Sequence, residues 1–123
     1  MHSNPAFSQA VLVEGAHKRL IIGGQNAVDG AGNIVGAGDL EQQTEQVLKN
    51  LLTLLEEAGA KAEDVVRWNV YLVQGQDPRV AFGVFQKVLQ TTGPPPTVTV
   101  LQVAGLAHPG FLLEINGEAV MAG

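Results

Sequence analysis

The sequence predicts an α+β fold in which two helices cover one face of a mixed β-sheet. Two segments repeat apolar residues at helical spacing, and each follows an aspartate that can cap a helix. Segments rich in β-branched residues precede, separate and follow them. Because two helices can cover only one face of such a sheet, the other face needs a partner. The length of 123 residues matches one domain, which we assign to residues 1–123.

The N-terminal part predicts a β-hairpin. Ala10–Glu14 and Arg19–Ile22 are short β-type segments, and Gly15–Lys18 joins them as the turn. Gly23 and Gly24 follow the second segment and are expected to end its strand.

The first helix is expected to begin after a loop rich in glycine and asparagine, Asn26–Asp39. Asp39 can cap its first turn, with Gln42 as the reciprocal partner of a capping box. Gly59 is expected to end this helix. The residues that recur at helical spacing, and should be buried, are Leu40, Thr44, Val47, Leu48, Leu51, Leu54, Leu55 and Ala58.

Val65–Val73 predicts the next strand because β-branched and aromatic residues dominate it. Asp77 and Pro78 then supply a cap and a first helical residue. Glycine inside a helix costs about 1 kcal/mol relative to alanine, so Gly83 predicts close packing of this second helix against the sheet. The residues expected on its buried face are Val80, Ala81, Val84, Phe85, Val88 and Leu89.

The last two strands are predicted at Thr97–Ala104 and Phe111–Met121. The prolines of Pro94–Pro96 cannot donate ladder hydrogen bonds, so they should deliver an extended chain to the edge of the sheet. Glu114 stands between two apolar residues, where an unpaired charge would be costly to bury. The residues expected on the uncovered face are Val98, Val100 and Leu112.

The composition argues against several classes of function. The net charge of −5 and the lack of a basic run argue against nucleic-acid binding. Without cysteine there is no disulfide, thiol nucleophile or zinc–thiolate site, and the histidine spacing suggests no metal, so we expect no cofactor. We expect no signal peptide, because the first ten residues lack a basic region followed by an apolar stretch, and no apolar run approaches the roughly 20 residues that span a bilayer. We therefore expect a cytoplasmic protein without a membrane partner.

Gly93–Ile115 reads GPPPTVTVLQVAGLAHPGFLLEI, with a proline-fed strand, a turn and an apolar–Glu–Ile run. This segment resembles a signature of the RidA (YjgF) family of small trimeric imine/enamine deaminases. The signature's arginine falls on Val98, and its glutamate on Glu114. Asn4–Ala10 and Ile22–Gln25 are also similar to family segments, and the resemblance extends from about Asn4 to Val120.

The resemblance implies a chorismate-mutase-like fold, a homotrimer and small-molecule clefts between subunits. In deaminating members, the arginine clamps the carboxylate of a 2-imino acid, and the glutamate positions or activates the water that attacks the imine carbon. Glu114 is thus the candidate catalytic residue. Val98 cannot replace the two-pronged, charge-assisted grip of a guanidinium.

Other cleft positions implied by the resemblance are also less polar here. Phe7 stands in a tyrosine's place, Gly23 where serine is common, and Phe82 where deaminating members usually have asparagine. We therefore expect an imine or enamine hydrolase for a more apolar or aromatic molecule. The candidate ligand-binding residues are Phe7, Gly23, Gly24, Phe82, Val98 and Thr99.

Several alternatives remain open from sequence. The chain could be a non-catalytic module that holds a small molecule in the same clefts. Arg67 or Arg79 could reach the cleft and replace the missing guanidinium, although each is more typical of a solvated position. Ribonuclease activity, reported for parts of the family, fits poorly with the acidic charge and the lack of a histidine pair.

Overall fold

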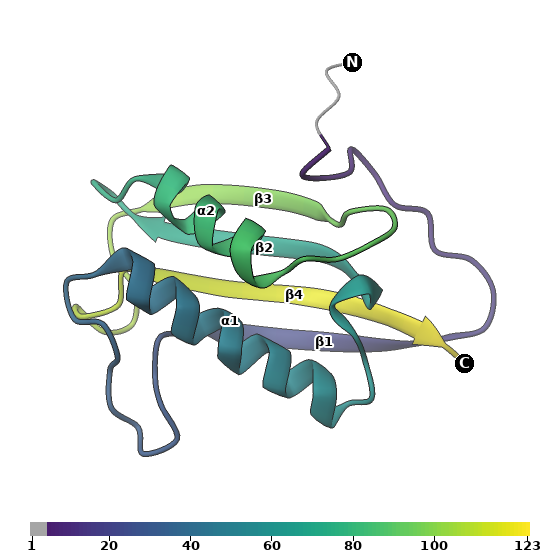
Figure 1. Cartoon of the computed structure of the whole chain (residues 1–123), viewed down its shortest axis with the longest axis horizontal. Coiled ribbons are helices and arrows are strands. Elements are labelled where there is room, and N and C mark those ends of the chain that lie inside the picture. Colours follow the sequence, from purple (N-terminus) through teal and green to yellow (C-terminus); the bar gives the residue numbers. More distant parts are fainter. Residues whose placement is uncertain (1–4) are drawn as a thin grey trace.

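A mixed sheet of four strands, in the order β1-β4-β2-β3, forms the body of the molecule (Figure 1). The computed structural model describes residues 5–123, so the Asn4 that begins the family resemblance lies outside the described residues. β4 runs antiparallel to β1 and β2, whereas β2 and β3 are parallel. The strands are β1 (His17–Gln25), β2 (Val65–Val73), β3 (Thr97–Val103) and β4 (Leu113–Ala122).

Two α-helices, α1 (Leu40–Glu57) and α2 (Pro78–Val88), lie on the same face of this sheet (Figure 1). A short 3-10 turn, Ala62–Asp64, links α1 to β2. Apolar side chains from α1, α2 and the inner face of the sheet form the core. The predicted α+β fold, with helices on one face of a mixed sheet, is confirmed.

α1 begins and ends as the sequence predicts. The side chain of Asp39 accepts a hydrogen bond from the backbone N–H of Gln42 at 3.2 Å. The predicted reciprocal hydrogen bond, from the backbone N–H of Asp39 to the side chain of Gln42, does not form. That N–H donates to the carbonyl of Gly36 instead, so this half of the capping-box prediction is wrong. Gly59 follows the helix with a φ of +75°, a conformation that glycine adopts without strain. On the predicted buried face, Ala58 is exposed, since the helix has already ended there.

α2 is also capped as predicted, by Asp77 with Pro78 in the first turn. Its buried face is narrower than expected, because only Ala81 and Val84 are fully buried. Phe85 and Leu89 are partly buried, but Val80 and Val88 are exposed, which corrects the prediction for these two.

The predicted close packing at Gly83 is also wrong. Gly83 is exposed, and a Cβ there would meet nothing within 4 Å. This glycine therefore lies on an exposed side of α2 and not against the sheet.

The predicted N-terminal hairpin does not form. Ala10–Glu14 has no strand, and its Leu12 is 81% exposed. β propensity alone does not hold a strand that has no apolar surface to cover. Gly23 and Gly24 do not end β1, which continues through a register shift to Gln25.

Strand alternation decides which face each site residue occupies. On β4 the buried positions alternate with half-buried ones, so Leu113 and Ile115 face the helices and Glu114 faces away. β3 aligns Val98 with Trp68 and Val100 with Val70, which are both buried under the helices.

Val98 and Val100 therefore face the helices, and their predicted place on the uncovered face is wrong. Leu112 precedes β4, is partly buried and packs against the core. The neighbouring Thr97, Thr99 and Leu101 alternate onto the uncovered face instead.

Candidate functional site

The candidate residues lie in two regions, one on each face of the sheet. Glu114 occupies the uncovered face, on β4 opposite Tyr71 of β2, and is half-buried. The side-chain amide of Asn26 donates to its Oε1 at 3.3 Å and to the carbonyl of Leu113 at 3.2 Å. A polar contact thus fixes one oxygen of this carboxylate.

The carboxylate of Glu114 fits beside Gly24 because glycine has no Cβ. A Cβ at Gly24 would lie 2.7 Å from the carboxyl carbon of Glu114, closer than atoms can approach without a shift. At Gly23, a Cβ would meet nothing within 4 Å. Of the two predicted glycines, only Gly24 is next to the candidate catalytic group.

A polar chain anchors Asn26 to α1. The side-chain amide of Asn50 donates to the carbonyls of Asn26 at 3.2 Å and Val28 at 2.9 Å. Gln46 donates in turn to the side-chain oxygen of Asn50 at 2.9 Å. Asn26 was not among the predicted site residues, because a loop asparagine gives no signal of its partner from sequence.

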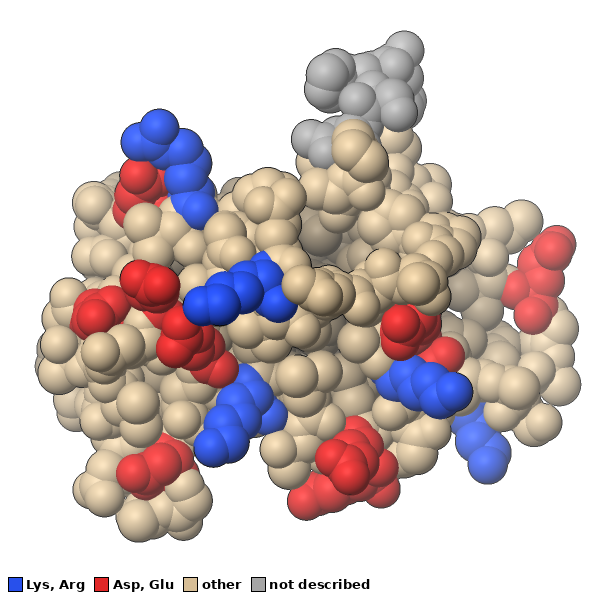
Figure 2. All heavy atoms as spheres, viewed as in Figure 1, with Lys and Arg blue, Asp and Glu red and all other residues tan. Residues whose placement is uncertain are grey.

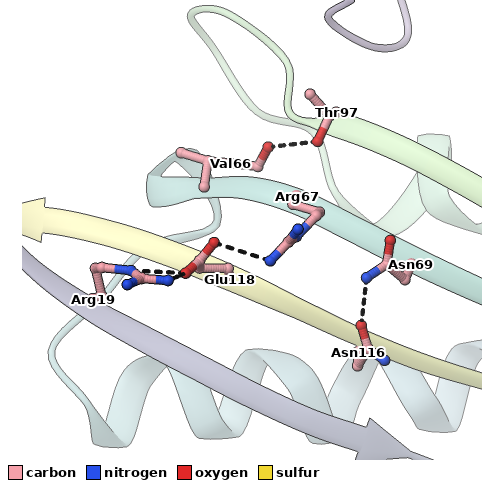
Figure 3. Close-up of polar contacts among 7 residues, drawn as sticks. All are labelled: Arg19, Val66, Arg67, Asn69, Thr97, Asn116 and Glu118. Atoms are coloured by element: carbon pink, nitrogen blue, oxygen red, sulfur yellow. Dashed lines mark hydrogen bonds and ion pairs between the residues drawn. The ribbon is translucent and has the colours of Figure 1, made fainter. Parts of the chain in front are cut away.

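Charged and polar groups continue along the uncovered face (Figure 3). Arg19 and Arg67 both bind Glu118, whose side chain is only 12% exposed, with Nη2 of Arg67 at 3.3 Å from Oε2. The amide of Asn69 donates to the side-chain oxygen of Asn116 at 2.8 Å. The guanidinium of Arg67 is therefore paired with Glu118.

The other arginine considered as a replacement, Arg79, pairs with Asp77 at 3.0 Å. The side-chain hydrogen bond from Arg79 lowers the pKa of Asp77 below its ordinary value of 3.8. In turn, the hydrogen bond to Asp77 raises the pKa of Arg79. Neither Arg67 nor Arg79 lines the region around Val98.

That region is an apolar cavity of about 500 Å³ on the helix side of the sheet. It lies between α2, the strands β2 and β3, and the N-terminal segment, where Figure 2 shows a recess in the tan, uncharged surface. Phe7, Phe82 and Val98, all predicted ligand-binding residues, line it together. Within the described part of the chain, none of its lining residues is charged.

Two features place rings around this cavity. The backbone N–H of Ser8 donates to the carbonyl of Pro96 at 2.8 Å, and its hydroxyl donates to that of Pro95. This tether holds Phe7 beside the start of β3. Trp68 and Phe85 meet edge to face, with ring centroids 6.5 Å apart. Neither Trp68 nor Phe85 was predicted as a site residue, because an aromatic residue in a strand or on a buried helix face is also typical of the hydrophobic core.

The structure therefore brings Phe7, Phe82 and Val98 together, and separately brings Gly24 to Glu114. It does not unite the two groups within one chain, because Val98 and Glu114 face opposite sides of the sheet. Thr99 is exposed on the face opposite Val98 and does not line the cavity.

Residues 5–123 contain neither a membrane-spanning helix nor a cluster of metal-binding side chains. No helix there is long and apolar enough to cross a membrane. No three histidine or acidic side chains in this range are grouped so that they could hold a metal ion.

Sequence comparison relates the chain to known proteins. A family profile described as Endoribonuclease L-PSP matches residues 1–121. The 2-iminobutanoate/2-iminopropanoate deaminase of Rattus norvegicus is 32% identical over 117 residues, which cover 94% of this chain and 80% of that protein. A RutC family protein of Pyrococcus abyssi is 38% identical over 66 residues, which cover 54% of this chain and 50% of that relative. The chain thus spans only about half the length of the latter.

Solved structures show the same fold. The crystal structure of YyfB, a protein of the conserved Rid family from Yersinia pestis, matches with a TM-score of 0.81 and 36% identity, covering 94% of this chain and 87% of that one. YyfA from the same organism matches with a TM-score of 0.74 and 26% identity, covering 95% and 89%.

Proposed function

The chain belongs to the RidA (YjgF) family, and on this premise we propose that it hydrolyses an imine or enamine less polar than a 2-imino acid. The observation that carries the proposal is the uncharged, apolar cavity beside Val98. By the family resemblance, Val98 stands where deaminating members have the arginine that clamps a carboxylate. A substrate of this chain must therefore bind without an ion pair between its carboxylate and an arginine at this position.

The proposal places the reacting group in a cleft between subunits of a homotrimer. Within one chain, Glu114 and the cavity lie on opposite faces of the sheet, so one protomer cannot bring both to one molecule. In the proposed cleft, Glu114 of one copy approaches the cavity of the next. The exposed apolar side chains of Ile21 (65%) and Leu101 (50%) on the uncovered face favour such burial.

In the proposed reaction, Glu114 activates a water molecule. The carboxylate accepts a proton as the water oxygen bonds to the imine carbon, and the C=N double bond becomes a single bond. Glu114 passes this proton to nitrogen. The C–N bond then breaks as the new hydroxyl group gives its proton to the departing nitrogen, which leaves ammonia and a carbonyl compound. The hydrogen bond from Asn26 holds Oε1, so that Oε2, on the side of Gly24, can receive the proton.

The missing guanidinium sets the substrate preference. One charge-assisted hydrogen bond contributes about 1.5–3 kcal/mol, or one to two decades of binding. A 2-imino acid would also bring its carboxylate to a cavity whose described lining carries no charge, where desolvation is costly. We therefore expect 2-iminopropanoate to be a poor substrate.

The test compares ammonia release from two imines generated in situ. One is 2-iminopropanoate, and the other is a neutral imine made from a primary amine by an amine oxidase. We expect faster release from the neutral imine, and a fall of about 100-fold or more in Glu114→Gln. Glu45→Gln, which changes an exposed carboxylate on α1, is the matched control. Release from 2-iminopropanoate at a rate like that of deaminating members would refute the proposal.

A specific observation favours a second candidate, a non-catalytic binding module. The cavity itself is lined by no acid or base among the described residues. If Glu114→Gln leaves any turnover unchanged, the catalytic role of this carboxylate is wrong. If that variant changes only ligand affinity, the binding module is the better account.

Ribonuclease activity is not proposed. The chain carries a net charge of −5, which opposes contact with phosphates. Its two described histidines contact their own turns: Nδ1 of His17 lies 2.8 Å from the carbonyl of Gly15, and Nδ1 of His108 accepts from the N–H of Gly110 at 2.8 Å. Neither of these contacts joins one histidine to the other, as a catalytic histidine pair would require.

A further inference from the structure

The apolar cavity holds most of the aromatic side chains of the protein. The sequence contains four phenylalanines, one tryptophan and one tyrosine. Three of these phenylalanines and the tryptophan line the cavity. They come from distant parts of the sequence, so chain proximity does not explain their meeting. The aromatic residues lining the cavity are Phe7, Trp68, Phe82 and Phe85.

These rings differ in exposure from the floor of the cavity to its rim. Trp68 is 3% exposed and packs edge to face with the partly buried Phe85, at an interplanar angle of 73°. Phe82, one helical turn from Phe85, remains 45% exposed. An exposed phenylalanine at the rim of an aromatic cavity is suited to cover a flat ligand.

The polar groups around the cavity are few and neutral. Gln86 in the last turn of α2, with Gln90 and Thr91 after the helix, contributes to a lining that holds two amides and a hydroxyl. Such groups can bind one carbonyl or imine, but they cannot neutralise a carboxylate. The volume of about 500 Å³ lies in the range of small-molecule sites, roughly 300–1,000 Å³.

We infer that the cavity binds a neutral aromatic molecule of one or two rings that carries a single carbonyl or imine group. The inference deepens the proposed function and rests on it for the reaction, but not for binding. The substrate class would be an aryl imine. Water adds to its C=N carbon, the C–N bond breaks, and an aryl ketone and ammonia leave.

Binding of the ketone product can be measured without any catalysis. Calorimetry compares acetophenone with phenylglyoxylate, which carries a carboxylate in place of the methyl group, and with cyclohexyl methyl ketone, which lacks the aromatic ring. We expect phenylglyoxylate to bind at least tenfold more weakly than acetophenone. Cyclohexyl methyl ketone should bind about two- to tenfold more weakly, because it loses the ring contacts.

Trp68 reports where the ligand binds, because it is the only tryptophan in the sequence and lines the cavity. Acetophenone should quench its fluorescence over the same concentration range as the calorimetric titration, after correction against free N-acetyltryptophanamide. Binding without a change at Trp68 would place the ligand elsewhere and overturn the inference.

Two pairs of variants test the lining residues. Phe82→Ala removes the exposed rim ring, which α2 can lose without a buried gap, and should weaken acetophenone binding about tenfold. Leu12→Ala, at an 81% exposed position outside the sheet and outside the cavity lining, is its control. Val98→Arg should shift the preference towards phenylglyoxylate, whereas Leu12→Arg, outside the sheet and the cavity lining, should not. If Val98→Arg does not fold, the comparison of Phe82→Ala with its control still tests whether the ligand binds in the cavity.

The outcomes separate this inference from the proposed function. Absence of acetophenone binding, or equal binding of phenylglyoxylate, overturns the inference even if imine turnover is found. It is also overturned if Phe82→Ala leaves acetophenone affinity unchanged but alters the oligomeric state, since a second copy would then occupy the cavity. If acetophenone binds as expected and an aryl imine is not hydrolysed, the inference stands and the proposed hydrolase fails.

Discussion

The side-chain amide of Asn26 donates a hydrogen bond of 3.3 Å to Oε1 of Glu114, which joins the loop after β1 to the candidate catalytic strand. The same nitrogen lies 3.2 Å from the carbonyl of Leu113, so its position is fixed by two acceptors. The loop between β1 and α1 therefore orients the carboxylate.

Asn26→Ala should lower kcat of the proposed hydrolysis about tenfold, with little change in KM, because Glu114 loses the group that orients it. Steady-state kinetics on a neutral imine would measure both constants. Asn33→Ala, in the exposed part of the same loop, is the matched control. An unchanged kcat in Asn26→Ala would show that the contact does not position the carboxylate.

Gly24→Ala should displace Glu114 with little loss of stability. The added Cβ would come within 2.7 Å of the carboxyl carbon, but that group is the flexible end of a side chain and can turn away. We expect turnover to fall at least tenfold, while the thermal midpoint changes little. Gly23→Ala adds a methyl group to open space and should leave both unchanged. Equal activities of the two variants would contradict this role for Gly24.

Gln43→Leu should destabilise the fold by about 3 kcal/mol. Gln43 is fully buried, donates to the carbonyls of Gly36 and Gly110, and accepts from the N–H of Leu112 at 2.9 Å. Leucine would leave these backbone groups without a partner. Urea denaturation measures the change, and Gln42→Leu, on the exposed side of α1, should cost less than about 0.5 kcal/mol.

The ion pair at the start of α2 predicts a dependence on pH. Because Arg79 lowers the pKa of Asp77 in the folded state, the charged carboxylate stabilises the fold. This contribution is present above the ordinary pKa of 3.8 and is lost as the pH falls through the lower, folded value.

Asp77→Asn should therefore be less stable than the native chain at pH 7, and the difference should shrink as the pH falls below 3.8. Both groups are exposed, so the effect should be small and weakened by salt. Thermal unfolding of the two proteins across this range would measure it. If the stability difference between the two proteins grew as the pH fell, it would contradict stabilisation of the fold by the charged Asp77 carboxylate.

The homotrimer predicts a mass of about three times 12.9 kDa in light scattering. Ile21→Arg, at a 65% exposed position on the uncovered face, should weaken this assembly. Leu12→Arg, at an 81% exposed position outside the sheet, should not. A native chain that remains monomeric at working concentration would rule out the proposed cleft between copies.

Local signals in the sequence predicted much of the fold. β2 spans Val65–Val73 as predicted, and α1 begins after Asp39 and ends before Gly59. Capping aspartates, a terminal glycine and β-branched runs act within a few residues, so sequence spacing reveals them. Ala10–Glu14 has a similar β-type composition but no strand, because a strand also needs a neighbour and a surface to cover.

For the site, the sequence by itself determined that a lone carboxylate, Glu114, stands in an apolar strand and that Val98 offers no cation. Only the tertiary structure decided that these residues face opposite sides of the sheet. The parallel register sets Val98 beside Trp68 and turns it towards the helices, while alternation along β4 turns Glu114 away from them. Register is a relation between strands distant in sequence, so neither strand encodes it alone.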